Sequence, residues 1–339
     1  MMRVIVCTAD QKLQIQVKEQ PIFSLNTQVN FARISIKAFG INRADLLQKA
    51  GHYPAPPGVA KDILGLEFAG VIEAFSNGAD HCEGFQLGDR VMGICSGEAY
   101  AEQIIVPCGH LLPIPAQFSF STAASIPEAH LTAYDALVNQ GQLKEEDEIL
   151  IHAIGSGVGC AAAKIADFLG AKVSGTTRSL WKKERALSQL HLQKVYLSEH
   201  GRFMGADEQN NFDLILDFIG AAYLKENMQR LKHQGRLVMI GLLGGIKAEL
   251  NLGILLAKRA QIIGTVLRSR SIQEKADLTQ AYRQKILPFL IKNTESLQSE
   301  DQGIKLEPVY KVYAPHELEQ AHQDLAHSQV WSKLVCQWD

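Results

Sequence analysis

Residues 147–170, DEILIHAIGSGVGCAAAKIADFLG, contain the pattern of a buried strand, a glycine-rich turn and a helix. Residues 148–153 form a short run rich in Ile, which is typical of a buried parallel strand. Gly155, Gly157 and Gly159 follow at alternate positions, and the Ala-rich segment after them has apolar residues at helical spacing. Such a turn brings backbone N–H groups and the positive end of a helix dipole together. The stretch therefore predicts a pyrophosphate-binding turn of the Rossmann type.

The spacing of this turn departs from the usual G-x-G-x-x-G pattern, because the last position counted from Gly155 is Cys160. The register that fits is A-x-x-S-x-x-G, from Ala153 through Ser156 to Gly159. A small residue at each of these points still allows the backbone to approach a phosphate closely. Glycine turns can also serve strand–helix packing alone, so the surrounding pattern decides between the two interpretations. The turn predicts four cofactor-binding residues, Ser156, Gly157, Val158 and Gly159.

Length and composition indicate a globular protein of two domains. The chain has 339 residues, which is more than one hydrophobic core usually serves, and 46% of them are hydrophobic. The formal net charge is −2 and there is no block of Lys or Arg, which argues against nucleic acid or a charged membrane surface as a partner. The longest uncharged run, residues 149–163, is too short to span a bilayer. The apolar run within the first ten residues is too short for a signal peptide.

Six cysteines are present, and no two are spaced as C-x-x-C. This spacing argues against a zinc knuckle, and a disulfide scaffold is unusual at this length. We therefore expect reduced thiols and a cytoplasmic protein.

The order of predicted elements changes near residue 119. Before it, strand-like runs with turn residues between them predict a many-stranded, barrel-like domain; the runs are residues 4–7, 13–17, 31–38 and 65–74. Residues 122–140 are predicted as one helical stretch. Strands and helices alternate from residue 148 onward, which predicts the α/β class with a doubly wound parallel sheet. The predicted strands are residues 148–153, 172–176, 212–218, 235–240 and 261–266, and the predicted helices 181–192 and 223–231.

Beyond residue 270 the pattern predicts a single helix over residues 272–291 and then a polar loop over 293–303. A strand near residues 309–312, a helix over 316–326 and a strand at 334–335 follow.

The residues after the second strand of this sheet favour NADPH over NADH. An NAD-preferring site places an acid there to accept from the ribose 2′-hydroxyl. Here the strand is followed by Arg178, Ser179 and Lys182, and the first acid is Glu184. A 2′-phosphate carries about −1.5 to −2 charges near neutral pH, so two cations and a hydroxyl suit it. The alternative is an ordinary solvated basic helix start.

Several further motifs resemble one family over essentially the whole chain. They are Gly40-Ile41-Asn42-Arg43-Ala44-Asp45, Gly51-His52-Tyr53-Pro54, Gly88-Asp89-Arg90-Val91, Ile126-Pro127-Glu128-Ala129 and Leu267-Arg268-Ser269-Arg270. With the glycine turn, they resemble the quinone oxidoreductase branch of the medium-chain dehydrogenase/reductase superfamily, above all its p53-inducible quinone oxidoreductase subgroup. The resemblance implies a GroES-like catalytic domain over residues 1–123, a Rossmann NADPH-binding domain over 124–266 and a segment over 267–339 that returns to the catalytic domain. It also implies a cleft between domains and a homodimer formed through the Rossmann domains.

The resemblance also assigns site residues. Asn42, Asp45 and Tyr53 would line the substrate site. Further cofactor-binding positions would be Thr132, Ile219, Gly241, Leu242, Val266, Leu267 and Arg268. The family's adenosine-side Tyr would be Tyr196, although Ser198 is the alternative match. The chain departs from the family pattern at His130, where Trp is usual, at Leu47, where related enzymes have a second Tyr, and at Ser332, where Gly is usual.

Zinc-dependent members of this superfamily need a Cys ligand and a His-Glu pair. This chain has Asn42 in place of the Cys and Leu66 in place of the His. Zinc needs N or S ligands in a tetrahedral array, which an amide and a leucine cannot supply. We therefore expect no metal and regard Glu67 as a structural carboxylate.

The predicted activity is hydride transfer from NADPH to a quinone or a related electron-poor carbonyl compound. Without metal, hydrogen-bond donors must polarise the carbonyl, and Asn42 and Tyr53 are the candidates. Asn42 and Asp45 could instead cap the short helix that follows them, and Tyr53 could be a packing residue. Two functional alternatives stay open: reduction of an enone or alkenal double bond, and a NADPH-binding protein with little turnover.

Overall fold

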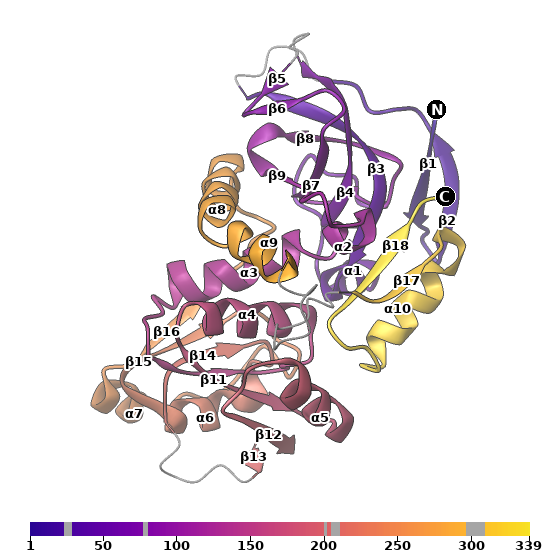
Figure 1. Cartoon of the computed structure of the whole chain (residues 1–339). Coiled ribbons are helices and arrows are strands. Elements are labelled where there is room, and N and C mark those ends of the chain that lie inside the picture. The colour runs from indigo at the N-terminus through magenta and orange to yellow at the C-terminus, as the bar shows by residue number, and fades with distance from the viewer. Residues whose placement is uncertain (24–28, 77–80, 200–201, 205–210, 296–308) are drawn as a thin grey trace. The chain divides into compact units, whose positions relative to one another are not determined.

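The computed structural model describes residues 1–23, 29–76, 81–199, 202–204, 211–295 and 309–339. These residues form two compact units (Figure 1). Unit 1 contains the described residues of Met1–Leu131 and those from Leu267 onward, and unit 2 contains those of Thr132–Val266. The domain limits that the resemblance implies stay a prediction.

Unit 2 is built on a seven-stranded sheet with the order β13-β12-β11-β10-β14-β15-β16. The strands are β10 (Glu148–Ile151), β11 (Lys172–Thr177), β12 (Lys194–Glu199), β13 (Arg202–Met204), β14 (Phe212–Asp217), β15 (Leu231–Met239) and β16 (Gln261–Gly264). All neighbouring strands are parallel except β13, which runs antiparallel to β12. The predicted doubly wound parallel sheet is therefore confirmed.

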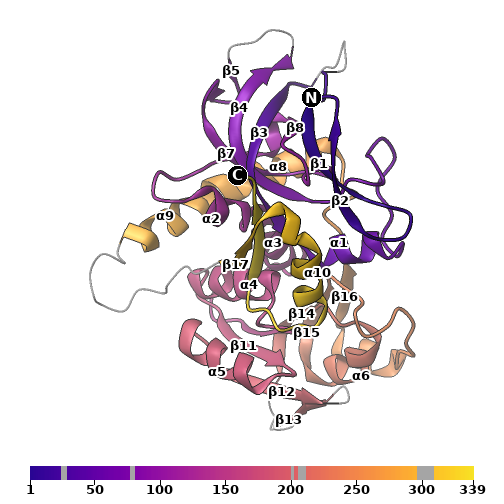
Figure 2. The same cartoon turned by 90° about the vertical axis from the view of Figure 1, so that its right-hand side faces the viewer.

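Helices connect the strands of unit 2 and cover its sheet. They are α4 (Gly157–Phe168), α5 (Leu180–Gln189), α6 (Ala221–Arg230) and α7 (Leu252–Lys258), with a π-helical segment, η3 (Asp135–Gln140), before β10. Figure 2 shows α5 and α6 on opposite sides of the strands, as right-handed crossovers on either side of β10 require. Because both faces are covered, Leu150, Ile215 and Leu237 of the central strands are fully buried.

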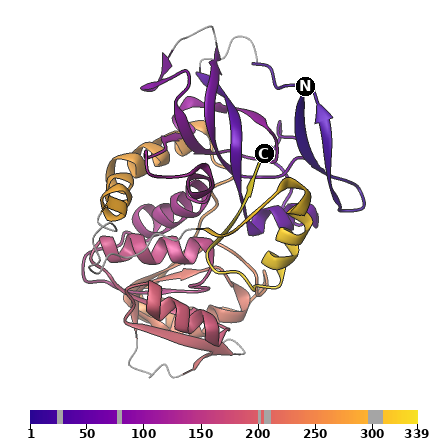
Figure 3. The same cartoon turned by 45° about the vertical axis from the view of Figure 1, so that its right-hand side comes forward.

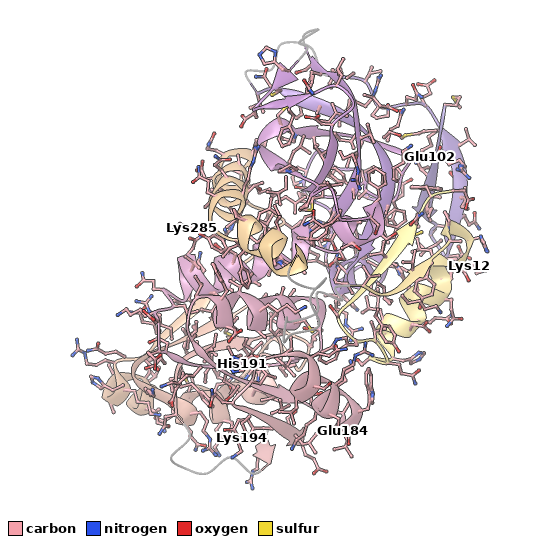
Figure 4. All side chains as sticks on the ribbon, in the orientation of Figure 1. Lys12, Glu102, Glu184, His191, Lys194 and Lys285 are labelled. Atoms are coloured by element: carbon pink, nitrogen blue, oxygen red, sulfur yellow. The ribbon has the colours of Figure 1, made fainter. Side chains whose placement is uncertain are left out.

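Unit 1 is centred on a second sheet, with the order β17-β18-β3-β4-β7-β9 and with β8 also paired to β3. Its strands are β3 (Phe31–Ile41), β4 (Glu67–Phe75), β7 (Arg90–Ile94), β8 (Gln103–Pro107), β9 (Leu111–Pro113), β17 (Val309–Tyr313) and β18 (Lys333–Gln337); β1 (Met2–Cys7) pairs with β2 (Leu13–Lys18) and β5 (His81–Cys82) with β6 (Phe85–Gln86). Strand β18 pairs antiparallel with β3, so the C-terminal segment lies beside N-terminal strands (Figure 3). Glu102, labelled in Figure 4, binds the backbone N–H and side chain of Arg3 in β1 at 2.6 and 2.8 Å.

The helices of unit 1 correct two predictions. The helices are α1 (Arg43–Lys49), α2 (Phe120–Ala124), α3 (Pro127–Tyr134, whose last residues belong to unit 2), α8 (Ile272–Lys285), α9 (Leu287–Glu295) and α10 (Leu318–Ala326), with short 3-10 turns η2 (Cys108–His110) and η5 (Pro315–Glu317). The single helical stretch predicted over 122–140 is wrong, because it divides into α2, α3 and η3, with a break before Pro127. The single helix predicted over 272–291 is also wrong: it divides at Ile286, close to Pro288, whose nitrogen carries no hydrogen. The predicted polar loop over 293–303 lies largely outside the described residues.

A search of the described helices finds none with the length and apolar composition that a membrane crossing needs.

Candidate functional site

The glycine turn of unit 2 joins the carboxyl end of β10 to α4, as predicted. Ser156 caps α4, and its side-chain oxygen accepts a hydrogen bond from the Gly159 N–H at 3.0 Å. The N–H groups of Gly157 and Val158, in the first turn of α4, have no hydrogen-bond partner among the described residues. These two donors and the helix dipole are what a pyrophosphate needs. The residues of this turn therefore fit the phosphates of a nicotinamide dinucleotide.

Gly159 is required by packing at this turn. A Cβ built there would lie 2.5 Å from the Ala153 carbonyl oxygen and 3.0 Å from the Ile154 Cα. Ala153 itself has a φ of +46°, in the left-handed region that disfavours a side chain. The small residues of the A-x-x-S-x-x-G register therefore let α4 start directly against the end of β10.

The start of α5 carries the three residues predicted to bind a 2′-phosphate. Arg178 is exposed directly after β11 and forms no ion pair among the described residues. Ser179 is the N-cap residue of α5, but its side chain makes no capping hydrogen bond. Lys182 lies in the first turn, with its ammonium 5.3 Å from the centre of the Trp181 ring. The first acid, Glu184, is exposed farther along α5. Two cations and a hydroxyl thus follow the carboxyl end of β11.

Other predicted cofactor residues follow neighbouring strands of the same sheet. Ile219 comes after β14, and Gly241 and Leu242 come after β15. Because these strands are parallel to β10 and β11, their carboxyl ends share one edge of the sheet, where open α/β sheets bind ligands. Thr132 lies half-buried on α3, and Val266 is half-exposed after β16.

A buried network of polar side chains connects the strands at this carboxyl edge of the sheet. The sequence did not indicate this network. The two nitrogens of the His152 ring lie 2.9 Å from Thr176 Oγ1 and 2.7 Å from Asn227 Oδ1. The Asn227 amide donates to Asp217 Oδ2 at 3.0 Å, and Asp217 Oδ1 accepts from the Ile219 N–H at 2.6 Å. Burial lowers the pKa of His152, so its ring is neutral here. The network therefore links the ends of β10, β11 and β14.

The predicted adenosine-side tyrosine lies in the core of unit 2. Tyr196 is 2% exposed and packs with Phe212 and Tyr223. The alternative, Ser198, is also buried, and its hydroxyl accepts a hydrogen bond from the Tyr223 hydroxyl at 2.5 Å. Both side chains are therefore buried in protein contacts. The cofactor role of Tyr196 stays a prediction, and its burial does not support that role.

In unit 1, Asp45 and Asn42 form a capping box at the start of α1, as the structural alternative predicts. Asp45 is fully buried, and each of its oxygens is occupied by donors. Its Oδ1 accepts from the Gly65 N–H at 3.1 Å, and its Oδ2 from the Asn42 N–H at 2.8 Å and the Tyr100 hydroxyl at 3.1 Å. Burial raises the pKa of Asp45 to about 6, although these donors oppose the shift. Its carboxyl is thus committed to the fold.

The Asn42 side chain bridges a buried ion pair. Its amide N–H donates to Glu67 Oε1 at 2.9 Å, and its amide oxygen accepts from the Lys333 ammonium at 2.6 Å. Lys333 and Glu67 are 2.5 Å apart, and their side chains are 5% and 0% exposed. Glu67 is therefore a structural carboxylate, as expected. Asn42 was proposed to polarise the substrate carbonyl, but one N–H of its amide already donates to Glu67. Sequence reasoning missed Lys333, which lies 266 residues from Glu67.

Tyr53 lies half-buried in the loop after α1, and Arg268 holds that loop. The Arg268 guanidinium is 5.1 Å from the centre of the Tyr53 ring and donates to the Tyr53 carbonyl at 3.3 Å. It also donates to the Ser96 carbonyl at 2.7 Å and to Gln48 Oε1 at 2.5 Å. The predicted cofactor residues Leu267 and Arg268 are buried in unit 1, and the Arg268 side chain is occupied by protein groups. Arg268 thus positions the loop of Tyr53.

Two further charged residues lie in this region of unit 1, and sequence reasoning gave neither a role. Glu128 is the second residue of α3, and its backbone N–H donates to Glu67 Oε2 at 2.9 Å. Lys275 of α8 is 3% exposed, and its ammonium donates to the Arg268 carbonyl at 2.7 Å. Glu128 belongs to the Ile126-Pro127-Glu128-Ala129 motif and could have been singled out from it. Lys275 lies in no sequence motif, so the sequence offered no means of finding it.

Among the residues that the structure describes, no three or more His, Cys, Asp or Glu side chains are arranged to hold a metal ion. The expectation of a zinc-free protein stays a prediction.

Comparisons with known proteins match both units. The alcohol dehydrogenase GroES-like domain family matches residues 29–116, and the zinc-binding dehydrogenase family matches residues 157–283. Human quinone oxidoreductase is 29% identical over 249 residues, which are 71% of this chain and 73% of that protein. The synaptic vesicle membrane protein VAT-1 homolog-like of Mus musculus is 30% identical over 68% of this chain and 53% of that protein. The chain also matches three polyketide synthases, of which it spans only 4 to 13%.

Solved structures share the fold over nearly the whole chain. The human synaptic vesicle membrane protein VAT-1 homolog-like protein is 25% identical, with a TM-score of 0.77 over 100% of this chain and 98% of that chain. An NAD-dependent alcohol dehydrogenase is also 25% identical, with a TM-score of 0.79 and 99% coverage of both chains.

Proposed function

The chain belongs to the medium-chain dehydrogenase/reductase superfamily of oxidoreductases, and from this premise we propose that it is a NADPH-dependent, zinc-independent reductase of quinones or related electron-poor carbonyl compounds. The likeness to human quinone oxidoreductase supports the quinone oxidoreductase branch. A bound nicotinamide would supply the hydride, while the protein would orient the acceptor and provide hydrogen bonds and a proton.

One observation carries the choice of cofactor: Arg178, Ser179 and Lys182 follow the carboxyl end of β11 where an NAD site has an acid. The turn from Ser156 to Gly159 would hold the pyrophosphate beside them. A solved relative is named for NAD, so the preference between the two nicotinamides needs a direct test.

A screen of acceptors tests the proposed activity. NADPH oxidation would be followed at 340 nm with 9,10-phenanthrenequinone, 1,2-naphthoquinone and a 2-alkenal. We expect turnover with the quinones. Faster turnover of the 2-alkenal would favour double-bond reduction instead. If NADPH binds and no acceptor is reduced, the chain is a binding protein and the proposed activity is wrong.

Removal of the basic residues at the start of α5 should abolish the preference for NADPH. We expect Arg178→Ala with Lys182→Ala to raise the KM for NADPH by at least about tenfold, because roughly 1.4 kcal/mol of phosphate contact is a factor of ten. The KM for NADH should change less than twofold. Steady-state kinetics with both cofactors measure this, and Lys172→Ala, on a half-exposed lysine at the opposite end of β11, is the control. Equal effects on both cofactors would contradict the 2′-phosphate assignment.

We also propose that two copies associate through unit 2. Leu252 and Leu256 lie one turn apart on α7 and are 63% and 76% exposed, and Ile246 before them is 77% exposed. Strand β16 is the last in its sheet, so one of its edges has no neighbouring strand among the described residues. Exposed apolar side chains and an unpaired strand edge are each typical of an association site.

Changing this apolar surface should separate the copies. We expect Leu256→Asp to convert a dimer into a monomer, because a carboxylate in an apolar interface has no partner. Light scattering after size-exclusion chromatography measures the mass. Ile22→Asp, at an 87% exposed apolar residue of unit 1, should leave the mass unchanged. A wild-type chain that is monomeric would refute the association.

A further inference from the structure

A buried carboxylate that the sequence did not single out lies at the start of η3 in unit 2. Asp135 is the first residue of η3 and is 2% exposed. Its Oδ1 accepts hydrogen bonds from the side-chain amides of Asn139 at 3.0 Å and Gln140 at 3.3 Å, and its Oδ2 accepts from the Thr265 hydroxyl at 2.8 Å. One oxygen therefore stabilises η3 itself, and the other connects η3 to the residue that directly follows β16.

The other end of η3 is anchored to β15. Arg236 of β15 donates to the Gln140 carbonyl at 3.3 Å. The Thr265 N–H donates to the carbonyl of Met239, the last residue of β15, at 3.0 Å. Turns of π-helix are rare and lie frequently at functional sites. The hydrogen bond from Asp135 to Thr265 therefore joins a helical segment that is fixed at its far end to the carboxyl edge of the sheet.

The strand order decides which half of a dinucleotide would lie beside Thr265. The glycine turn follows β10, and the two cations predicted to bind the 2′-phosphate follow β11, the neighbour of β10 on one side. Strands β14, β15 and β16 lie on the other side of β10. A dinucleotide with its pyrophosphate at the glycine turn and its adenosine half at β11 therefore extends its nicotinamide half towards β14, β15 and β16. Thr265 follows the last of these strands.

The hydrogen bond between Asp135 and Thr265 also joins two positions that the family resemblance assigns to the cofactor. Val266 comes directly after Thr265, and Thr132 precedes Asp135 by three residues on α3, which continues into η3 without a break. All four residues belong to unit 2. The bond therefore holds both positions in place within a single compact unit.

We propose that Asp135 is a positioning residue for the nicotinamide half of the cofactor and acts through Thr265. The inference rests on the proposed function, which supplies the cofactor. The buried carboxylate holds the Thr265 hydroxyl and so fixes the backbone of Thr265 and Val266 at the edge where the nicotinamide half lies. Because this bond exists before the cofactor binds, binding does not have to order the segment after β16.

The pair Thr265→Val and Thr265→Ser tests this role, because valine keeps the shape of threonine without the hydroxyl and serine keeps the hydroxyl. Isothermal titration calorimetry of the full chain would measure the Kd for NADPH and for adenosine 2′,5′-bisphosphate, which lacks the nicotinamide half. We expect Thr265→Val to raise the Kd for NADPH about tenfold, equivalent to roughly 1.4 kcal/mol. The Kd for adenosine 2′,5′-bisphosphate should change less than twofold. Thr265→Ser should bind both ligands like the wild type.

Removal of the carboxylate shows whether it acts through Thr265. Asp135→Ala should also weaken NADPH binding selectively, and the addition of Thr265→Val should weaken it no further. The matched control is Asp213→Ala, which removes a half-buried carboxylate near the opposite end of β14 that accepts from the Glu148 N–H at 2.8 Å. It should leave both affinities unchanged. Thermal unfolding checks the fold of each variant, and the two Thr265 variants decide alone if Asp135→Ala does not fold.

The positioning role and the proposed function fail in different ways. Equal losses of affinity for both ligands in Thr265→Val would indicate a general structural role and refute the positioning of the nicotinamide half. Unchanged NADPH affinity, or additive effects of Asp135→Ala and Thr265→Val, would refute it as well. A wild type that binds NADPH but reduces no acceptor refutes the reductase function, while the binding comparison still decides on Asp135. A wild type that binds neither NADPH nor NADH refutes both.

Discussion

Lys333→Ala is expected to lower the free energy of unfolding by about 3–5 kcal/mol, the cost of leaving one partner of a buried ion pair without the other. The ammonium of Lys333 is held by Glu67, by the Asn42 amide oxygen at 2.6 Å and by the Ile41 carbonyl at 3.2 Å. Its removal leaves the Glu67 carboxylate fully buried with only N–H donors. Chemical denaturation monitored by circular dichroism measures the loss.

Two further variants show whether the buried charge is the cause. Lys311→Ala removes a half-exposed lysine of β17 whose partner, Asp324, lies 3.8 Å away, and it should cost at most about 1 kcal/mol. Combining Lys333→Met with Glu67→Gln removes both charges and should recover much of the lost stability. If the double variant is less stable than Lys333→Ala, the packing of the lysine chain, not its charge, dominates.

Gly159→Val should abolish tight NADPH binding. The atoms around a Cβ at this position are backbone atoms of Ala153 and Ile154, at 2.5 to 3.0 Å, so they cannot move aside as a flexible side chain would. The start of α4 must shift, and with it the N–H groups of Gly157 and Val158. We expect the Kd for NADPH to rise at least about 100-fold, equivalent to roughly 2.7 kcal/mol, and stability to fall by about 1–3 kcal/mol.

Fluorescence titration with NADPH and thermal unfolding measure these two effects. The control is Gly264→Ala in β16 of the same sheet, where a built Cβ has no atom within 4 Å. Undiminished NADPH affinity in Gly159→Val would show that the pyrophosphate does not bind at this turn.

Local patterns explain what could be predicted from the sequence. The strand, turn and helix from β10 to α4 are contiguous, and their apolar spacing and glycines follow from sheet and helix geometry. Breaks caused by Pro127 and Pro288 were missed because the apolar spacing continues across them. The strand β12 and the helix α7 were not predicted, since each is short and carries a weak periodic signal.

The candidate site was harder to predict, because its key contacts are not local. Lys333 and Glu67 are 266 residues apart, and Arg268 reaches Gln48 across 220. From the sequence alone, Asp45 could be either a helix-capping residue or a catalytic residue. In the structure its carboxylate accepts hydrogen bonds from the Asn42 N–H and the Tyr100 hydroxyl, which identifies it as the capping residue of α1.

The pairing of β18 with β3 has a consequence for synthesis on the ribosome. Glu67 is translated 266 residues before Lys333, the cation that neutralises it. At about 5–20 residues per second, roughly 13–50 s separate the two. Unit 2 is made within that interval and can fold first, because its described residues are continuous in sequence between Thr132 and Val266. Unit 1 therefore cannot complete its core until Lys333 has been translated and can pair with Glu67. During that interval the unfinished unit exposes apolar surface and needs protection from aggregation.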